Sequence, residues 1–571
     1  MTVSPPAESP APNNNTGISY DLGCLALLVG LLFFFNLGNT SLANPDEGRY
    51  AEIPREMLAS GDWVTPRLNG VNYFEKPPLV YWLIAGSQII FGRNEWAIRA
   101  VPALFALGGV LLTYAAARAL RGRLAGLLSA SVLATSLIYF GIARIVILDM
   151  TVSVLMSAAL FCFILGVREA PGSRRRWLFY ALYTSMALAT LTKGLIGFLV
   201  TGAVMFLWLL VFNQWRRLLP LYLPTGVVLF LGIASPWHVL AALQNPTWAH
   251  RYFVYEHWQR FFENVASRPG PWYYYIGIVL AGLIPWVGFL WPALRDGVRG
   301  GWAAREKNAD TWFLVTWVGF IFFFFSVNHS KLPPYILPVF PALAVLIGTW
   351  LAQRWTESDA AQLRTGFRIF SSVCGLLSLA LCAIVFLPQA QAKAHLQPAQ
   401  ALLLRPYTLG LAVVLILGGG LVPWLAKTRR TSAALIALTT TMAVFYLLVT
   451  FAQPLFQKAG TKDLALIVRG RAQPGDRVVH YHDFFHDFTF YAERVVDVVA
   501  AKGEIELEED PAAIAGDRFM DDAEFRRRWA GPVRIWVVAQ KDATAKLFAD
   551  PSFRYYLLDE SRSHCLFSNQ P

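Results

Sequence analysis

Long apolar segments recur along almost the whole chain, and they limit its fold more than any other feature. A helix that crosses a bilayer core of roughly 30 Å needs about 20 apolar residues. Because hydrocarbon satisfies no exposed backbone group, such segments must be helical. We therefore expect an all-α polytopic membrane protein with thirteen spans, near residues 19–37, 96–118, 124–141, 150–167, 178–191, 194–212, 219–243, 272–291, 311–327, 334–351, 369–388, 406–425 and 431–451.

The composition agrees with a membrane protein and excludes most other classes. Hydrophobic residues make up 56% of the 571 residues and charged residues 15%, against roughly 45–50% and 25% in soluble domains. The net charge of +12 needs no nucleic acid, because Lys and Arg collect in cytoplasmic loops and bind anionic membrane lipids. Soluble, disordered, collagen-like and disulfide-stapled chains are excluded.

The basic residues predict the orientation. The short loops on one side of the expected bundle carry 18 Lys and Arg, and those on the other side carry 8 over a similar length. The positive-inside rule then places residues 1–18, a Pro/Asn-rich and disordered segment, in the cytoplasm. With an odd number of spans, the C-terminus then lies on the opposite, outer side of the membrane.

Two segments of the chain are neither spans nor short loops. Residues 38–95 form a long outer loop within the transmembrane domain 19–451, and its apolar run 79–91 is too short to span, which predicts an interfacial or re-entrant helix. The tail, 452–571, has the composition of a small α/β domain. Its pattern predicts strands at 477–481, 494–499 and 534–538 and a helix at 521–529.

Charged residues gather at the outer ends of the helices, where their cost suggests function. The first group is the NPDEGRY segment at 44–50, which contains Asp46, Glu47, Arg49 and Tyr50. A capped helix start explains this segment equally well, since acidic residues favour the first turn of a helix.

The second group is Glu75-Lys76-Pro77-Pro78. One interpretation is a rigid turn with an ion pair and no further role. The prolines would also hold the lysine at a fixed height over the membrane, as phosphate binding requires.

Three further charged positions follow along the chain. Asp149 begins an apolar helix five residues after Arg144, so a structural Asp–Arg pair is one interpretation. Lys193 stands in a two-residue outer turn that needs no lysine, which favours an anionic partner. Lys331 and Tyr335 stand at the start of another helix. Snorkelling of the side chain to the membrane surface explains a single lysine there, but it does not explain why all these charged groups lie on the outer side of the membrane.

The sequence indicates a cofactor less clearly than it indicates the charged groups above. Glu75 with His257 could help to hold a divalent cation, either zinc or magnesium, although sequence alone cannot bring them together. The chain has no Walker loop, GxGxxG, GxSxG or HExxH motif, so we expect no nucleotide cofactor.

Taken in order, these groups resemble the bacterial branch of the protein O-mannosyltransferase family. The matching residues are Asp46-Glu47-x-Arg49-Tyr50, Glu75-Lys76-Pro77-Pro78, Arg144 with Asp149, Thr192-Lys193-Gly194 and Lys331-Leu332-Pro333-x-Tyr335. Within that family the chain is similar to the lipid A 4-amino-4-deoxy-L-arabinose transferases over its whole length. The resemblance implies a glycosyltransferase C (GT-C) fold and an enzyme that moves aminoarabinose from undecaprenyl phosphate to a lipid A phosphate, which lowers surface charge and gives resistance to polymyxin and other cationic peptides.

The resemblance also implies roles for the candidate residues. Arg49, Lys76, Lys331 and Tyr335 would hold the donor phosphate by charge-assisted hydrogen bonds. Catalysis would involve Asp46, Asp149 and Lys76, and substrate binding Glu47, Tyr50, Arg144 and Lys193. Asp46 would bind or stabilise positive charge on the sugar if the acceptor is a phosphate, and would act as a base if it is a hydroxyl.

Two other functions stay open at this point. Another polyprenyl-linked sugar could be transferred to protein or glycan. A transporter or flippase also carries intramembrane charges, although here they gather at one face and no interrupted spans recur in two halves. We expect a monomer with lipid partners and no nucleic acid.

Overall fold

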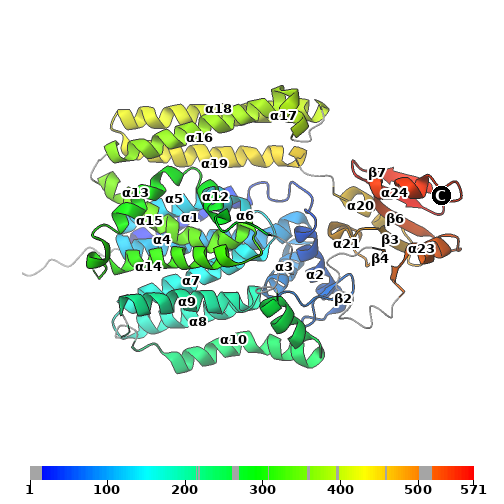
Figure 1. Ribbon diagram of the computed structural model, residues 1–571, viewed down its shortest axis with the longest axis horizontal. Coiled ribbons are helices and arrows are strands. Elements are labelled where there is room, and N and C mark those ends of the chain that lie inside the picture. Colours follow the sequence, from blue (N-terminus) through cyan, green and yellow to red (C-terminus); the bar gives the residue numbers. More distant parts are fainter. Residues whose placement is uncertain are drawn as a thin grey trace, which may run out of the picture.

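The computed structural model describes residues 16–213, 215, 219–259, 269–306, 308–356, 360–393, 398–456, 460–500 and 517–571. Most of the predicted disordered segment 1–18 therefore lies outside the described residues. In the described part, a bundle of long helices carries a small sheet domain at one end (Figure 1). We call that end of the bundle the outer end and the opposite one the inner end.

Nine helical segments in the described part are long and apolar enough to cross a membrane. They are α1 (Thr16–Phe34), α4 (Glu95–Arg121), α7 (Leu148–Arg168), α10 (Leu223–Gln244), α14 (Ala309–Val327), η4 (Pro333–Val339) continued by α15 (Phe340–Thr356), α16 (Ala360–Phe386), α18 (Pro398–Lys427) and α19 (Thr431–Phe456).

Two bent helix pairs raise this number to eleven if each pair is one span. The bends are 66° between α5 (Arg123–Thr135) and α6 (Leu137–Ala143) and 107° between α12 (Tyr274–Gly282) and α13 (Val287–Gly297). Pro285 lies in the second break, where its missing N–H interrupts the helical hydrogen bonds. Hydropathy does not show these bends.

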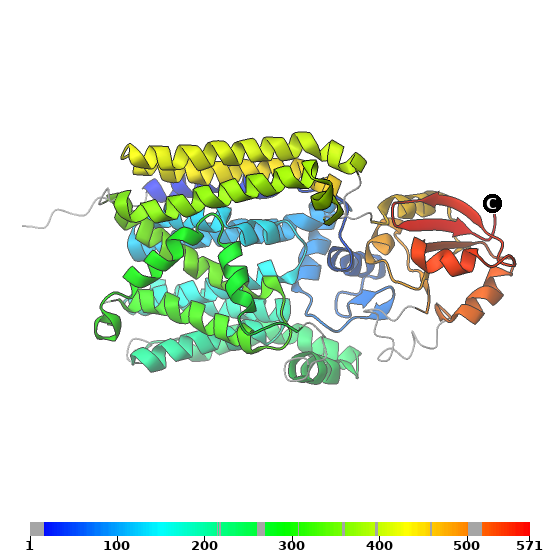
Figure 2. The same cartoon turned by 45° about the horizontal axis from the view of Figure 1, so that its top comes forward.

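The remaining two predicted spans are α8 (Ser173–Lys193) and α9 (Ile196–Phe212), which run along the same bundle (Figure 2). The thirteen predicted segments thus coincide with eleven single helices and two bent pairs. In the described part, three short helices lie between the long ones: η2 (His250–Gln259), η3 (Gly301–Ala304) and α17 (Pro388–Lys393).

The outer loop folds into α2 (Asp46–Ser60), β1 (Arg67–Leu68), β2 (Val71–Asn72) and α3 (Leu79–Phe91). Helix α3 has the bounds expected for the interfacial helix. Its last residues, Ile89, Ile90 and Phe91, are exposed, as suits a helix with one face in lipid.

The tail folds into a six-stranded sheet with the order β5-β4-β3-β6-β8-β7. Strands β5, β4, β3 and β6 are parallel, and β8 and β7 are antiparallel to their neighbours. The strands predicted from the sequence are present and the predicted helix is α23. The elements are α20 (Lys462–Arg471), β3 (Arg477–Tyr481), α21 (His486–Ala492), β4 (Asp497–Val499), β5 (Phe519–Met520), α23 (Asp522–Trp529), β6 (Ile535–Gln540), α24 (Lys541–Phe548), β7 (Tyr556–Glu560) and β8 (His564–Ser568).

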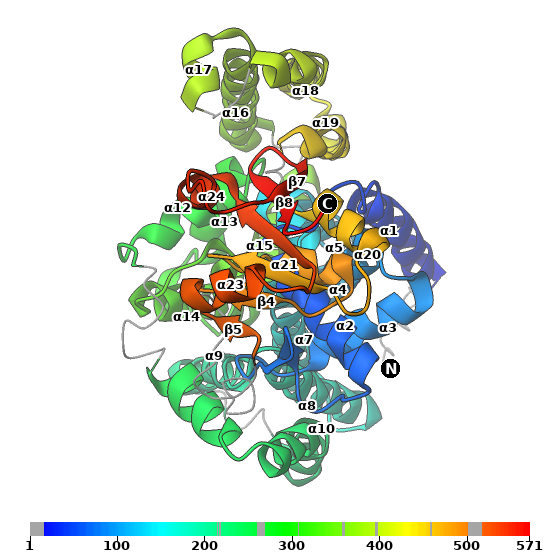
Figure 3. The same ribbon diagram turned by 90° about the vertical axis from the view of Figure 1, so that its right-hand side faces the viewer.

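The sheet domain lies over the outer end of the bundle (Figure 3). One apolar core runs through α2, α3 and the tail, and it contains Ile53, Tyr81, Phe488 and Trp536. The tail is therefore packed directly on the outer loop.

Hydrogen bonds fix the tail to the outer loop at several points. The Asn44 side chain donates to the Asp487 carboxylate and accepts from the Asp487 backbone N–H. The Asn69 side chain donates to the backbone carbonyl of Val496 and accepts from its N–H. The Tyr491 hydroxyl accepts from Leu42 N and donates to Glu95. Asn69 and Tyr491 are buried, and buried polar groups whose hydrogen bonds are satisfied resist separation.

Helix α2 approaches α21 very closely at Gly48. A Cβ added there would lie 2.5 Å from the backbone N of Asp487. Only a residue without a side chain permits this spacing.

Gly48→Ala should therefore push the tail away from α2 and destabilise the folded protein by about 1–3 kcal/mol, the usual cost of overpacking. Thermal unfolding and protease cleavage of the tail would measure the effect. Gly86→Ala is the matched control, because Gly86 lies within α3 with open space around it. Equal melting temperatures for the two variants would contradict the close docking.

Candidate active site

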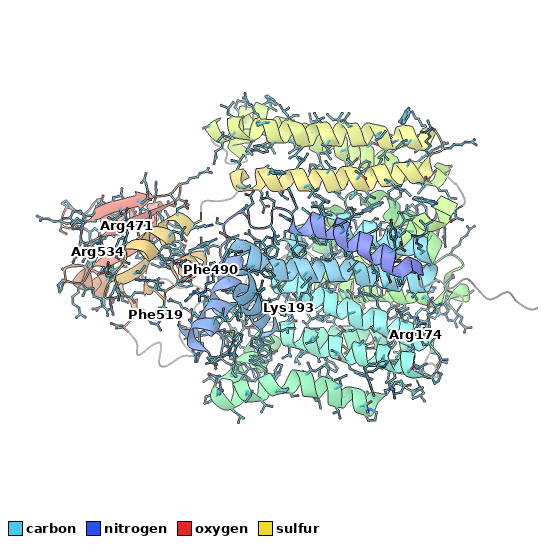
Figure 4. All side chains as sticks on the ribbon, turned by 180° about the vertical axis from the view of Figure 1, so that it is seen from behind. Arg174, Lys193, Arg471, Phe490, Phe519 and Arg534 are labelled. Carbon is cyan, nitrogen blue, oxygen red and sulfur yellow. The ribbon has the colours of Figure 1, made fainter. Side chains whose placement is uncertain are left out.

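The predicted site residues come from five segments that meet at the outer end of the bundle: the start of α2, the turn before α3, the start of α7, the end of α8 and the start of η4. Viewed from behind, Lys193 lies on the side of the bundle toward the tail, and Arg174, on the same helix α8, lies at the inner end (Figure 4). The site therefore lies beneath the tail.

Asp149 and Lys193 form an ion pair. Lys193 Nζ donates to Asp149 Oδ1 at 2.5 Å, and the two side chains are 16% and 14% exposed. The same ammonium lies 4.5 Å from the centre of the Tyr335 ring, a cation–π contact. Three predicted site residues, far apart in sequence, are thus in direct contact.

Arg144 does not pair with Asp149, so the Asp–Arg interpretation of this segment is wrong. The Arg144 guanidinium instead donates to the backbone carbonyls of Phe33, Phe35 and Asn36. These carbonyls follow or end α1, where no intrahelical donor remains. Arg144 therefore caps α1, and its guanidinium hydrogen-bonds to the end of that helix and not to the other predicted site residues.

Lys76 lies between two carboxylates. Its ammonium is 3.2 Å from Glu256 Oε2 and 3.7 Å from Glu75 Oε2, and it also donates to the Glu75 carbonyl. Glu256, on η2, is almost completely buried and faces Arg251 at 3.8 Å. This alternation of charges stabilises a lysine that is only 17% exposed.

Asp46 and Arg49 pair within the first turn of α2. The guanidinium is buried and lies 5.2 Å from the centre of the Tyr50 ring and 6.0 Å from that of Tyr73. Asp46 is 53% exposed, so one face of its carboxylate remains open to a ligand.

Tyr50 connects these groups electrostatically. Burial raises the pKa of its hydroxyl, Arg49 lowers it, and the carboxylates of Asp46, Glu75 and Asp149 raise it further. All four charges therefore lie within interaction range of a single side chain. The tyrosine stays protonated near neutral pH and can donate a hydrogen bond to an anion.

Glu47 lies apart from this cluster. Its carboxylate accepts two hydrogen bonds from Arg99 and one each from the backbone N–H groups of Ala43 and Val146. The carboxylate and the guanidinium are each 4% exposed. The substrate-binding role expected of Glu47 has no geometric support, because four donors already occupy its oxygens.

Lys331 binds backbone carbonyl groups close to it in the sequence. Its ammonium donates to the carbonyls of Ser326 and Asn328 at 2.7 and 2.6 Å, at the end of α14. Burial lowers the pKa of the ammonium. It borders a cavity of about 230 Å³ that also contacts Gly270 and His329.

Sequence reasoning missed Glu256 and Arg251. Both lie in the aromatic segment that drew attention through His257, and an acidic residue one position before that histidine was the available signal. It also did not predict that the tail reaches this site, where His486, on α21, lies within electrostatic range of Arg49 and Glu75.

The divalent cation expected from the sequence stays a prediction. Within the described residues, no three His, Cys, Asp or Glu side chains are grouped closely enough to hold a metal ion. The His257 side chain lies outside the described residues. Glu75, the other proposed ligand, faces Lys76, so the described side chains do not by themselves make up a metal site.

Known proteins of one family match this chain. Residues 22–245 match the family described as dolichyl-phosphate-mannose-protein mannosyltransferase. An undecaprenyl phosphate-α-4-amino-4-deoxy-L-arabinose arabinosyl transferase from Enterobacter sp. (strain 638) is 33% identical over 364 residues, which are 63% of this chain and 65% of that relative. The chain thus spans slightly less than two thirds of the curated relative in this alignment.

Two solved structures match almost end to end. The crystal structure of ArnT from Cupriavidus metallidurans bound to undecaprenyl phosphate has a TM-score of 0.83 and 29% identity, over 97% of this chain and 98% of that one. The apo structure of the same protein gives a TM-score of 0.81 at 30% identity, with the same coverage.

The Asp149–Lys193 pair predicts a measurable coupling. Asp149→Asn and Lys193→Met should each destabilise the protein, and the double variant should lose less than the sum, by about 1–3 kcal/mol, because the pair is largely removed from water. Unfolding of the two single variants and the double variant in detergent would measure it.

The control is the pair of Glu169 and Arg174, whose nitrogen and oxygen are 3.2 Å apart with the arginine mostly exposed. Its coupling should stay below about 1 kcal/mol, as for other surface pairs. Equal coupling in both pairs would show that Asp149 and Lys193 do not interact as a desolvated pair.

Proposed function

Because the chain belongs to the family of undecaprenyl phosphate–aminoarabinose arabinosyl transferases, we propose that it transfers 4-amino-4-deoxy-L-arabinose from undecaprenyl phosphate to a phosphate of lipid A. One observation carries this proposal most strongly. Cations and carboxylates from five separate segments gather at one end of a membrane-spanning bundle, beneath the tail. A lipid-linked donor presents its phosphate at that level.

The chain is a multi-pass membrane protein. We place it in the bacterial inner membrane with the site and the tail in the periplasm. The distribution of basic residues supports this orientation, since the short loops at the inner end carry 18 Lys and Arg and those at the outer end carry 8. A single chain supplies every site residue named above, so we propose that it acts as a monomer.

The reaction exchanges one phosphate for another at the anomeric carbon. An oxygen of the lipid A phosphate attacks that carbon, the bond between the carbon and the donor phosphate oxygen breaks, and undecaprenyl phosphate leaves with both electrons of the bond. Negative charge grows on the leaving phosphate in the transition state. Lys76, Arg49 and the hydroxyl groups of Tyr50 and Tyr335 would stabilise it there.

The acceptor needs no general base. A phosphate monoester loses its second proton near pH 6, so it is already ionised at neutral pH. Asp46 is then free for a different role. Its exposed carboxylate would bind the 4-ammonium group of the sugar, and Arg49 would hold that carboxylate in place.

Asp149 would act on the same side of the sugar, where positive charge develops at the anomeric carbon. Its negative charge is balanced by Lys193 in this structure. A phosphate near Lys193 would weaken that pair and leave the carboxylate available to the sugar.

The role of Asp46 can be separated from that of a base. Asp46→Asn should lower kcat/KM for the amino-sugar donor at least about tenfold more than for a neutral pentose donor, because the amide no longer attracts the ammonium. Rates with both donors in purified protein would test this. An equal loss with the two donors, with a pH–rate limb that disappears in Asp46→Asn, would indicate a base and a hydroxyl acceptor.

The acceptor is tested in cells. Mass spectra of lipid A from cells with the chain should show an added aminoarabinose, and spectra from cells without it, or with Lys76→Ala, should not. A modified protein or glycan with unmodified lipid A would point to a hydroxyl acceptor. Loss of donor from the outer leaflet without any transfer would point to a flippase.

A further inference from the structure

The inner end of the bundle carries a second charged system that the transfer reaction does not use. Three aspartates there each contact two arginines. Asp21 contacts Arg118 and Arg123, Asp296 contacts Arg295 and Arg354, and Asp310 contacts Arg121 and Arg168. Within the described residues, each of these groups thus brings two arginines to one aspartate.

A cavity of about 350 Å³ lies between parts of two of these groups. It is formed where α4, α13 and α15 end and α14 begins. The side chains that matter here are Arg121, Asp296, Arg299, Asn308, Thr311 and Gln353.

The cavity is positive despite its aspartate. Asp296 is held by two arginines and also accepts from the indole N–H of Trp350, so its charge is already compensated. Arg299 is exposed and has no ion pair within the described part of the chain. Two guanidinium groups and several neutral hydrogen-bonding groups thus face one space.

Exposed tryptophans place this cavity at the membrane surface. Trp291, on α13 one turn before Arg295, is 72% exposed, and Trp302, on η3, is 51% exposed. Indole rings collect where hydrocarbon meets lipid headgroups. A ligand that enters here comes from the level of the headgroups.

We propose that this cavity binds the phosphate headgroup of an anionic phospholipid in the leaflet at the inner end. Arg121 and Arg299 would pair with the phosphodiester, and Asn308, Thr311 and Gln353 would bind its remaining oxygens or the headgroup hydroxyls. Inorganic phosphate offers the same chemistry, but the exposed Trp291 and Trp302, which do not line the cavity, favour a ligand that comes from the level of the lipid headgroups. Such a lipid would join the ends of four helices.

Binding of phosphatidylglycerol and of phosphatidylcholine to the purified full-length protein, measured by native mass spectrometry, tests the proposal. Phosphatidylglycerol should bind at least about fivefold more tightly, which is the effect of one cation near an anionic headgroup. Arg299→Gln should remove most of this preference. Arg174→Gln, which changes a paired arginine on α8 at the same end (Figure 4), should leave it within about twofold.

Arg299→Gln breaks no ion pair of the described residues, so it should fold. The preference must also persist in Lys76→Ala, which alters only the outer end. Equal binding of the two lipids, or an equal loss in Arg174→Gln, would overturn the proposal. If inorganic phosphate at the same concentration displaced phosphatidylglycerol completely, the site would be one for a free anion and the lipid assignment would be wrong.

Discussion

The buried ion pair between Glu47 and Arg99 fixes the geometry on which the site depends. One carboxylate joins α2 to α4 and also accepts from the backbone before α2 and before α7. Asp46 precedes Glu47 directly, and Asp149 follows Val146 by three residues. The pair therefore sets the spacing between the carboxylates of Asp46 and Asp149, for which we propose roles in transfer. Removal of one partner would leave a buried charge, which typically costs several kcal/mol.

The tail extends this rigid frame. Its helix α21 packs on α2 through the reciprocal bonds of Asn44 with Asp487, and the Asp487 carboxylate also accepts from Thr461. Helix α2 is thus fixed on the side of the bundle by Arg99 and on the side of the tail by α21. We infer that the tail keeps Asp46 and Arg49 in position over the membrane, in agreement with the single core shared by α2, α3 and the tail.

The sequence could predict the parts of this structure that follow from local chemistry. Hydropathy located the helices, and length identified α3 as too short to span. It could not reveal the bends, since these depend on packing, nor the partner of Asp149, since Lys193 is 44 residues away. The sequence marks Arg144 and Lys331 as costly charges near the membrane. It cannot predict that they cap helices, because their partners are carbonyls at the C-terminal ends of α1 and α14. Glu256 is revealed by its contact with Lys76.

Two outer-end lysines differ in role under this proposal: Lys76 would bind the donor phosphate, whereas Lys331 caps a helix. Titration of undecaprenyl phosphate into the purified protein tests this directly. Lys76→Ala should weaken binding by at least about tenfold, because a charge-assisted contact to a partly desolvated phosphate is lost. Lys331→Met should change the affinity less than about twofold while lowering the melting temperature. The opposite ranking of the two affinities would contradict the account.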